Sequence, residues 1–149
     1  MSVFYLKGEG TVSSNVTAVT LSSDGDGQTI TLPAGLLVAN GDWIRITALC
    51  DCTGLTGVPN LVFGATTLST VPGLAAFSGG IIFEGLVFRT GAATQKAIGT
   101  FMRNGSVTDT AAFSPTETLA NTITIKTTLT SRSAGSIDFN ALVIEVGRV

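Results

Sequence analysis

The segment "FRTGAATQK", residues 88–96, has a composition that could form a phosphate-binding loop, because a glycine follows an apolar stretch and Lys96 comes shortly after. A Walker-type loop needs a glycine directly before its lysine and Ser or Thr directly after it, so that amides and side chains converge on phosphate and magnesium. Here Gln95 precedes Lys96 and Ala97 follows it. The dinucleotide-binding glycine pattern fails as well, because glycine is absent from the later glycine positions after Gly91. We therefore predict a β-hairpin turn in which Gly91 supplies a positive φ.

Catalytic groups of other kinds are sparse. The sequence has no histidine, which removes the usual general base near neutral pH and every nucleophile–histidine pair. Two of the ten acidic residues would have to converge in a cleft to support glycan hydrolysis. Most lie in turn-like segments, while Glu84 and Glu145 lie in apolar strands, where we expect each to face solvent or an interface and to pair with Arg. The sequence predicts no enzyme, no catalytic residue and no cofactor.

Two carboxylates in "SDGDGQ", Asp24 and Asp26, are spaced like the start of a calcium-binding loop. The EF-hand pattern requires a third oxygen ligand and a bidentate Glu at its twelfth position, which here is Gly35. We expect a hairpin turn at this segment and no metal.

The two cysteines, Cys50 and Cys52, stand two residues apart in "LCDCT". This spacing places both thiols on one face of a strand end, which is unsuited to a disulfide between them. Zinc needs four ligands, and this neighbourhood does not supply them. Two alternatives remain: reduced thiols in a loop of a cytoplasmic product, or inter-subunit thiols that pair with a neighbouring copy after release into an oxidising medium.

Short strands are the elements that must position these groups. Period-two alternation with frequent Thr and Val predicts strands, and Gly- and Pro-containing turns separate them, including "DCTGLTG" and "SRSAGS". No convincing helix is present, so we predict an all-β fold of about eight strands, an antiparallel sandwich or barrel. The expected strands are 12–21, 28–32, 42–49, 60–71, 80–90, 94–102, 121–130 and 136–146.

Two of these strands carry more specific expectations. In the strand 42–49, Ile44 and Ile46 should face the core, and Trp43 should pack in the core or against a subunit. The last strand should alternate without interruption, with Ile137 and Phe139 on the same face as Ala141, Val143 and Glu145.

Length and composition set the remaining bounds. With 149 residues, the chain predicts one β-sandwich domain, 11–149, preceded by an N-terminal arm or edge strand, 1–10. Basic residues are scattered and the net charge is −2, which argues against direct nucleic-acid binding. No apolar run is long enough for a spanning helix, and no signal-peptide pattern is visible, so we expect no membrane contact and synthesis in a cytoplasm.

Three segments, "LPAGLLVANGDWIRITAL", "FEGLVFRTGAATQKAIGTF" and "NTITIKTTLTSRSAGSIDFNALVIEV", resemble small jelly-roll structural proteins of tailed bacteriophages. In that group a "GD-x-I-R-I" strand, an "RTGA-x-x-Q" hairpin and a late "ITIK" strand followed by "D-x-x-ALVIE" recur in this order. The resemblance spans about residues 28–146. It implies an antiparallel, jelly-roll-like β-sandwich that assembles as a homotrimer and attaches to the virion, and it carries no catalytic residues.

The resemblance implies a capsid decoration (cement) protein that binds the major capsid protein or another virion protein and stabilises the head lattice. It would be assembled in the host cytoplasm and located at the capsid surface. The alternative is a tail, baseplate or head-fibre module that contacts the host surface, and a fibre-borne glycan hydrolase ranks third. We expect Phe4, Tyr5 and Leu6 to contact the capsid or another subunit, because exposed apolar arms need a partner surface.

Overall fold

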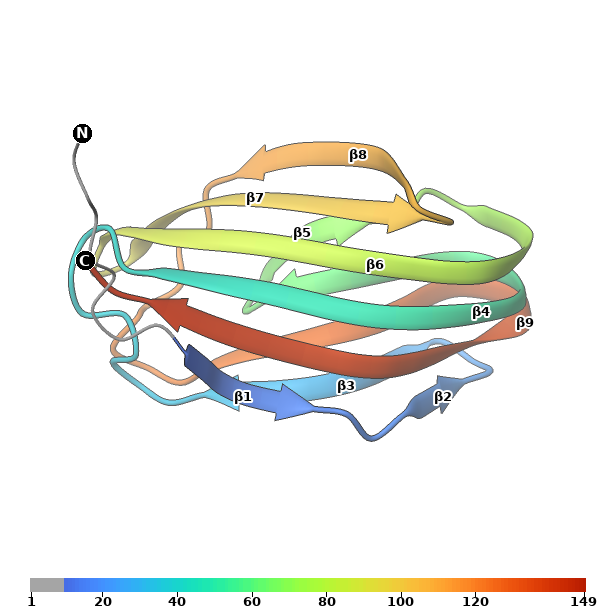
Figure 1. The fold of residues 1–149 in the computed structure, drawn as a ribbon, viewed down its shortest axis with the longest axis horizontal. Coiled ribbons are helices and arrows are strands. Elements are labelled where there is room, and N and C mark those ends of the chain that lie inside the picture. Colours follow the sequence, from blue (N-terminus) through green and yellow to red (C-terminus); the bar gives the residue numbers. More distant parts are fainter. Residues whose placement is uncertain (1–9) are drawn as a thin grey trace.

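The computed structural model describes the backbone of residues 10–149 and the side chains of residues 14–106 and 110–149. All helices and strands formed by these residues are β-strands, and no helix occurs among them (Figure 1). The described strands are β1 (Gly10–Asn15), β2 (Val19–Leu21), β3 (Gly25–Leu32), β4 (Trp43–Phe63), β5 (Thr66–Thr70), β6 (Leu74–Gly91), β7 (Thr94–Arg103), β8 (Ser106–Phe113) and β9 (Ile123–Gly147). None of the described residues belongs to a helix long and apolar enough to span a membrane.

All strand pairs are antiparallel, and the hydrogen-bonded order is β1–β9–β4–β6–β7–β8. β2 and β3 also pair with β9, and β5 pairs with β4. Figure 1 shows β8, β7, β6, β4 and β9 side by side in one layer, with β3 and β5 behind them. The predicted antiparallel β-sandwich is confirmed.

Two long strands, β4 and β9, contribute to both layers. Residues 43–52 of β4 pair with β6 and with residues 137–147 of β9, whereas residues 58–63 pair with β5 and with residues 125–130 of β9. We call residues 43–52 of β4 and residues 137–147 of β9, together with β1, β2, β6, β7 and β8, the front layer. Residues 58–63 of β4 and residues 125–130 of β9, together with β3 and β5, form the back layer. The register of β4 against β9 shifts between Thr53 and Val58, where the strands pass from one layer to the other.

The predicted turns "DCTGLTG" and "SRSAGS" are therefore wrong. Both segments are irregular stretches inside continuous strands, and each contains a glycine with positive φ, Gly54 at 54° and Gly135 at 74°. Gly135 must be a glycine for a second reason, since a Cβ there would overlap the backbone of Gly54. A glycine in the sequence is equally consistent with a turn and with a bend inside a strand. The two are distinguished only by whether the residues before and after the glycine pair with the same partner strand.

The last strand, β9, also departs from the prediction of uninterrupted alternation. Ile137 and Phe139 are buried, but the buried positions then become Leu142, Ile144 and Val146. Against β4, Phe139 pairs with Cys50 and Ala141 pairs with Leu49, which leaves Asn140 as an extra residue. This β-bulge exchanges the two faces of the strand, so Ala141, Val143 and Glu145 point away from the core.

Three further expectations differ from the structure. The strand expected at 60–71 is divided by a turn at Gly64 and Ala65 into the end of β4 and β5, which pair with each other. The strand expected at 12–21 is divided into β1 and β2, and β8, which was not expected, follows β7 through a tight hairpin. Asn104 and Gly105 have φ values of 49° and 80°, the pair of positive angles that an Asn-Gly hairpin requires. The polar sequence after this turn lacks the apolar alternation that would mark a strand.

The core lies between the two layers. In β4 the side chains of Ile44 and Ile46 are 1% and 0% exposed, so their predicted core-facing positions are confirmed. Phe83 and Phe101 meet with ring centroids 6.5 Å apart. Each large apolar side chain buried in this way contributes about 1.5–3 kcal/mol relative to an exposed one. The core therefore fixes the outward direction of every alternate residue in β4, β6 and β7.

Candidate functional site

The outer side of the front layer carries an unusual number of apolar side chains. Leu49, Phe88 and Ile98 are 41%, 38% and 48% exposed, and the other members are partly exposed. We call this surface the apolar face; its residues are Leu49, Ile82, Leu86, Phe88, Ile98, Met102 and Val143. They are contiguous across strands, since Leu86 pairs with Ile98 and Ile82 pairs with both Leu49 and Met102. Large exposed apolar patches mark interaction sites on folded proteins.

Four charged groups surround this face. Arg45 and Glu145, on adjacent strands, form an ion pair with Nη1 and Oε2 3.7 Å apart. The Arg45 guanidinium also lies over the Trp43 ring, 5.7 Å from its centroid. Glu84 and Lys96 form no ion pair among the described residues, and Lys96 Nζ donates a hydrogen bond to Ser114 Oγ at 2.8 Å. Thus one unpaired carboxylate and one unpaired ammonium flank the centre of the face.

The apolar face is hollowed at the β8 side. A shallow pocket of about 240 Å³ lies among Phe88, Ile98, Ala112 and Phe113, with Lys96 at its rim. Its lining has no carboxylate, so it offers an apolar side chain a place and gives no support to hydrolysis.

The outer side of the back layer is different in character. Its exposed residues are mostly threonines of β3 and β9, such as Thr29, Thr31 and Thr124. Lys126 Nζ forms an ion pair with Asp26 at 2.9 Å across the same two strands. This surface has the short hydroxyl groups and paired charges of a solvated sheet, which makes the apolar face the better candidate for binding.

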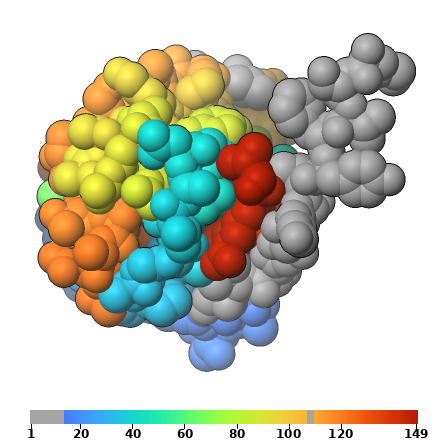
Figure 2. Space-filling model, turned by 90° about the vertical axis from the view of Figure 1, so that its left-hand side faces the viewer, coloured from blue at the N-terminus to red at the C-terminus, as the bar shows by residue number. Residues whose placement is uncertain are grey.

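Two of the sequence motifs, "NGD" and "FRTGA", lie at one end of the sandwich. Figure 2 shows this end, where the loop 33–42 lies beside the β6–β7 turn and the C-terminal residues. The Asp42 carboxylate accepts hydrogen bonds from the amides of Val38 (2.8 Å), Ala39 (2.9 Å) and Val149 (3.3 Å). Arg89 donates to the carbonyl oxygens of Leu37 and Val38. The "NGD" and "FRTGA" motifs thus connect loops to one another.

Ionisation of Asp42 is favoured by this arrangement. Burial raises the pKa of the carboxyl, but the three amide hydrogen bonds and the positive charge of Arg148 outweigh burial and hold the pKa below its ordinary value of 3.8. Asp42 is therefore an anionic anchor for the loop 33–42 and the C-terminus.

The tested phosphate-loop segment is the hairpin between β6 and β7, as predicted. Gly91 does not have the positive φ that we expected; a Cβ at this position would lie 2.5 Å from Thr94 Oγ1, so close contact is the reason for glycine. Gln95, 1% exposed, donates from Nε2 to Glu117 O (2.9 Å) and accepts from the Glu117 amide (3.0 Å). It connects β7 to the loop 114–122.

Three of the four candidate acids, Asp24, Asp26 and Glu145, have structural partners. Asp24 accepts hydrogen bonds from the amides of Ser131 and Arg132 at 2.9 and 2.7 Å, and Asp26 pairs with Lys126. The turn expected at "SDGDGQ" connects β2 to β3, which pair with β9 and not with each other, so it is not a hairpin. Glu145 pairs with Arg45 as predicted, whereas Glu84 is exposed without an Arg partner among the described side chains. No cluster of three or more Cys, Asp or Glu suited to a metal occurs among the described residues.

The two thiols point into the core from within β4. Cys50 and Cys52 are 3% and 4% exposed and free, so they share a face, as their spacing predicts, but lie in a strand and not in a loop. Burial, with the nearby Asp51 and Asp138 carboxylates, raises the pKa of Cys52 to about 12. Burial also raises the pKa of Cys50 well above its ordinary value. These positions give no support to inter-subunit thiols.

Contacts with a partner or within the core were also expected for Phe4, Tyr5, Leu6 and Trp43. Phe4, Tyr5 and Leu6 lie outside the residues that the structure describes. Trp43 is half-buried and packs on Gly147, where a Cβ would overlap its ring. It packs against its own chain at the border of the apolar face.

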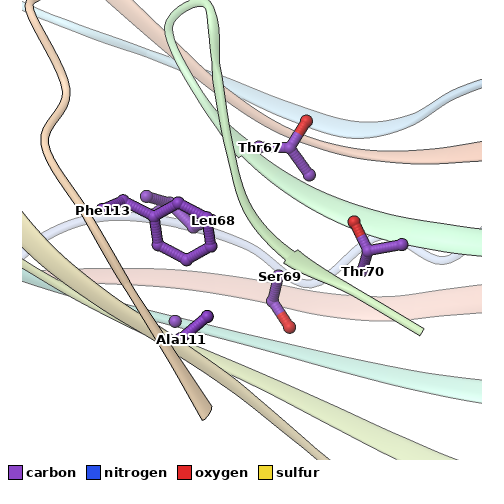
Figure 3. Close-up of a pocket in the computed structure, with 7 residues that line it drawn as sticks. Thr67, Leu68, Ser69, Thr70, Ala111 and Phe113 are labelled. Carbon is purple, nitrogen blue, oxygen red and sulfur yellow. The ribbon is translucent and has the colours of Figure 1, made fainter. Parts of the chain in front are cut away.

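A second hollow separates the edges of the two layers. Figure 3 shows Thr67, Leu68, Ser69 and Thr70 of β5 and Ala111 and Phe113 of β8 around a pocket of about 260 Å³. Its lining holds hydroxyl and apolar groups and no charged side chain. Such a lining offers no acid–base chemistry.

Sequence reasoning missed the apolar face as a site. A signal was available, because "IIFEGLVF" in β6 is apolar at Ile82, Leu86 and Phe88 as well as at the buried positions between them. A strand with one solvated face should alternate, so apolar residues at most positions of both faces indicate a strand whose two faces are both covered.

The comparisons with known proteins are sparse. No protein-family model matches the sequence, and no curated protein matches it. A mutant alginate lyase in complex with alginate trisaccharide resembles the structure at 8% sequence identity with a TM-score of 0.33, over 91% of this chain and 86% of that one. A TM-score this low establishes neither a shared fold nor an activity.

Proposed function

We propose that this chain is a structural protein of a tailed-bacteriophage virion, a capsid decoration (cement) protein that binds the head lattice and stabilises it. The observation that carries a binding function is the apolar face, which leaves hydrophobic side chains of four adjacent strands, β9, β4, β6 and β7, open to a protein partner. The sequence resemblance supports the virion as the place and the major capsid protein as a partner.

The contacts of the carboxylates and the lining of the hollow on the apolar face favour binding over catalysis. Asp24, Asp26 and Asp42 anchor backbone amides or a lysine, and the hollow on the apolar face has no acid in its lining. A rigid sandwich with these features stabilises a lattice by mass action. Each copy binds the assembled head and not its dissociated subunits, so the interface free energy of every bound copy favours the assembled state.

The test uses heads of the encoding phage that lack this protein. Added protein should sediment with the expanded heads at a saturating ratio and raise the temperature at which they rupture, as followed by light scattering. The predicted Phe4–Leu6 contact is tested in the same assay with a chain that lacks residues 1–8. That variant should lose head binding and keep its β circular-dichroism signal.

Other outcomes would contradict the proposal. Binding to purified tails but not to heads would favour a tail, baseplate or head-fibre module. Cleavage of a host glycan by the purified chain would favour a fibre-borne hydrolase. The homotrimer that the resemblance implies is measured separately, by solution mass.

A further inference from the structure

Two charged residues near the centre of the apolar face, Glu84 and Lys96, are placed so that they would pair between two copies of the chain. Leu86 and Ile98 are direct cross-strand partners at its middle. Glu84 lies two residues before Leu86 along β6, and Lys96 lies two residues before Ile98 along antiparallel β7, which places them on opposite sides of that pair. The two charged residues are separated by about 14 Å along the strands.

This arrangement has a symmetry consequence. A two-fold axis in the plane of the contact, passing between Leu86 and Ile98 and perpendicular to the line from Glu84 to Lys96, exchanges the positions of these two residues. In a pair of copies related by this axis, Glu84 of each copy faces Lys96 of the other, and the apolar centre of one face covers that of the other. An isologous contact of this kind is the commonest way in which identical chains pair.

We propose that two copies of this chain associate face to face through the apolar face, with reciprocal Glu84–Lys96 ion pairs around Leu86 and Ile98. Both charges lack an ion-pair partner among the described residues of their own chain. The hollow beside Ile98 and Ala112 gives an apolar side chain of the second copy a place to insert. Sheets packed face to face lie about 10 Å apart, which long Glu and Lys side chains can span.

The pairing goes beyond the proposed function, because it makes a second copy the partner of this face. It leaves head binding to the predicted contacts Phe4, Tyr5 and Leu6, and it holds whether or not the chain binds a head. It is also compatible with the three-fold association that the resemblance implies. Two-fold and three-fold axes together give six chains, whereas the two-fold pair alone gives two. An even number of chains is required in either case.

The test is a charge exchange read by solution mass. Light scattering of the wild-type chain, in low salt and at about 100 μM, should give the mass of two or six chains. Glu84→Lys and Lys96→Glu each place like charges opposite one another, so each should raise the dissociation constant of the pair at least about tenfold. The double variant restores opposite charges and should return to within about threefold of the wild type.

The matched control is Thr124→Lys, which adds a charge to the exposed back layer and should leave the mass unchanged. Circular dichroism of every variant establishes that the sandwich has folded. A wild-type mass of one or three chains would overturn the pairing, as would single variants that keep the wild-type dissociation constant. Pairing and head binding are measured separately, so failure of the pairing and failure of the proposed function are distinguishable. A single-charge variant that no longer pairs but still binds heads would support both proposals.

Discussion

At the residue scale, a few buried polar side chains organise the loops that close one end of the sandwich. Asp42 and Gln95 are each 1% exposed, and both bind main-chain groups of segments distant in sequence. With 12% charged residues, the chain relies on such neutral or single-charge connections. Removing one leaves buried backbone groups without partners, which costs more than the net gain of an ordinary hydrogen bond.

Gln95→Ala should lower the free energy of unfolding by about 2–3 kcal/mol, because it removes two hydrogen bonds and leaves the amide and carbonyl of Glu117 unpaired. Urea denaturation followed by tryptophan fluorescence measures this change. Thr116→Ala, at the exposed position next to Glu117, is the control. Equal stability of Gln95→Ala and the wild type would contradict the role of Gln95.

Asp42→Asn should make stability less dependent on pH in acid. The pKa of Asp42 is lower in the folded chain than its ordinary value of 3.8, so its stabilising effect is fully present above about pH 4 and is lost as the pH falls through the folded value. The variant should be about 1–3 kcal/mol less stable than the wild type at pH 7, and this difference should shrink below pH 4. Urea titrations from pH 7 to pH 2.5 measure it; a difference that is constant across this range would be evidence against the anchor.

At the element scale, the layers depend on positions where strands bend or approach closely. The bulge at Asn140 reverses the faces of β9, and the irregular segments at 53–58 and near Gly135 carry β4 and β9 between layers. β5 lies over β7 so closely that a Cβ on Gly99 would overlap the carbonyl oxygen of Leu68. Backbone cannot move aside as a flexible side chain can, so this contact restricts position 99 to glycine.

Gly99→Ala should therefore lower the free energy of unfolding by about 3 kcal/mol, the upper part of the range for overpacking. Gly73→Ala is the matched control, because a Cβ there meets nothing within 4 Å, and it should change stability by no more than about 0.5 kcal/mol. Thermal and urea unfolding of both variants give the comparison. A Gly99→Ala protein as stable as Gly73→Ala would show that β5 and β7 do not pack this closely.

At the scale of the whole molecule, the core shields the chain's reactive groups while one outer surface keeps apolar groups exposed. Cys50 and Cys52 are buried between the layers and their pKa values are raised, so the reactive thiolate is scarce near neutral pH. The same two-layer arrangement leaves apolar side chains of the apolar face exposed on the outside of the front layer.

We expect neither thiol of the folded chain to react with a disulfide reagent at pH 8 until the protein unfolds. The label should appear at the rate of unfolding, and the solution mass should be the same with and without reductant. Val16→Cys, at a position 73% exposed, is the positive control and should label at once. Rapid labelling of the wild type, or a mass that falls on reduction, would revive the inter-subunit thiols.

Local sequence was sufficient for the features that depend on short-range pattern and turn chemistry. Period-two alternation predicted an all-β chain and the core-facing side of Ile44 and Ile46, because the pleat alone sets which residues share a face. The β6–β7 hairpin followed from failed phosphate-loop motifs and a glycine-containing connection.

Tertiary structure alone decided the bulge at Asn140, the continuity of β4 and β9 and the burial of Cys50 and Cys52. A bulge or bend is defined by the register against a partner strand, which the strand's own residues do not contain. The apolar face was decided in the same way, since Leu86 and Ile98 become neighbours only through pairing of β6 with β7. The sequence of a strand shows that both of its faces are apolar, but only the fold determines which face packs in the core and which stays exposed.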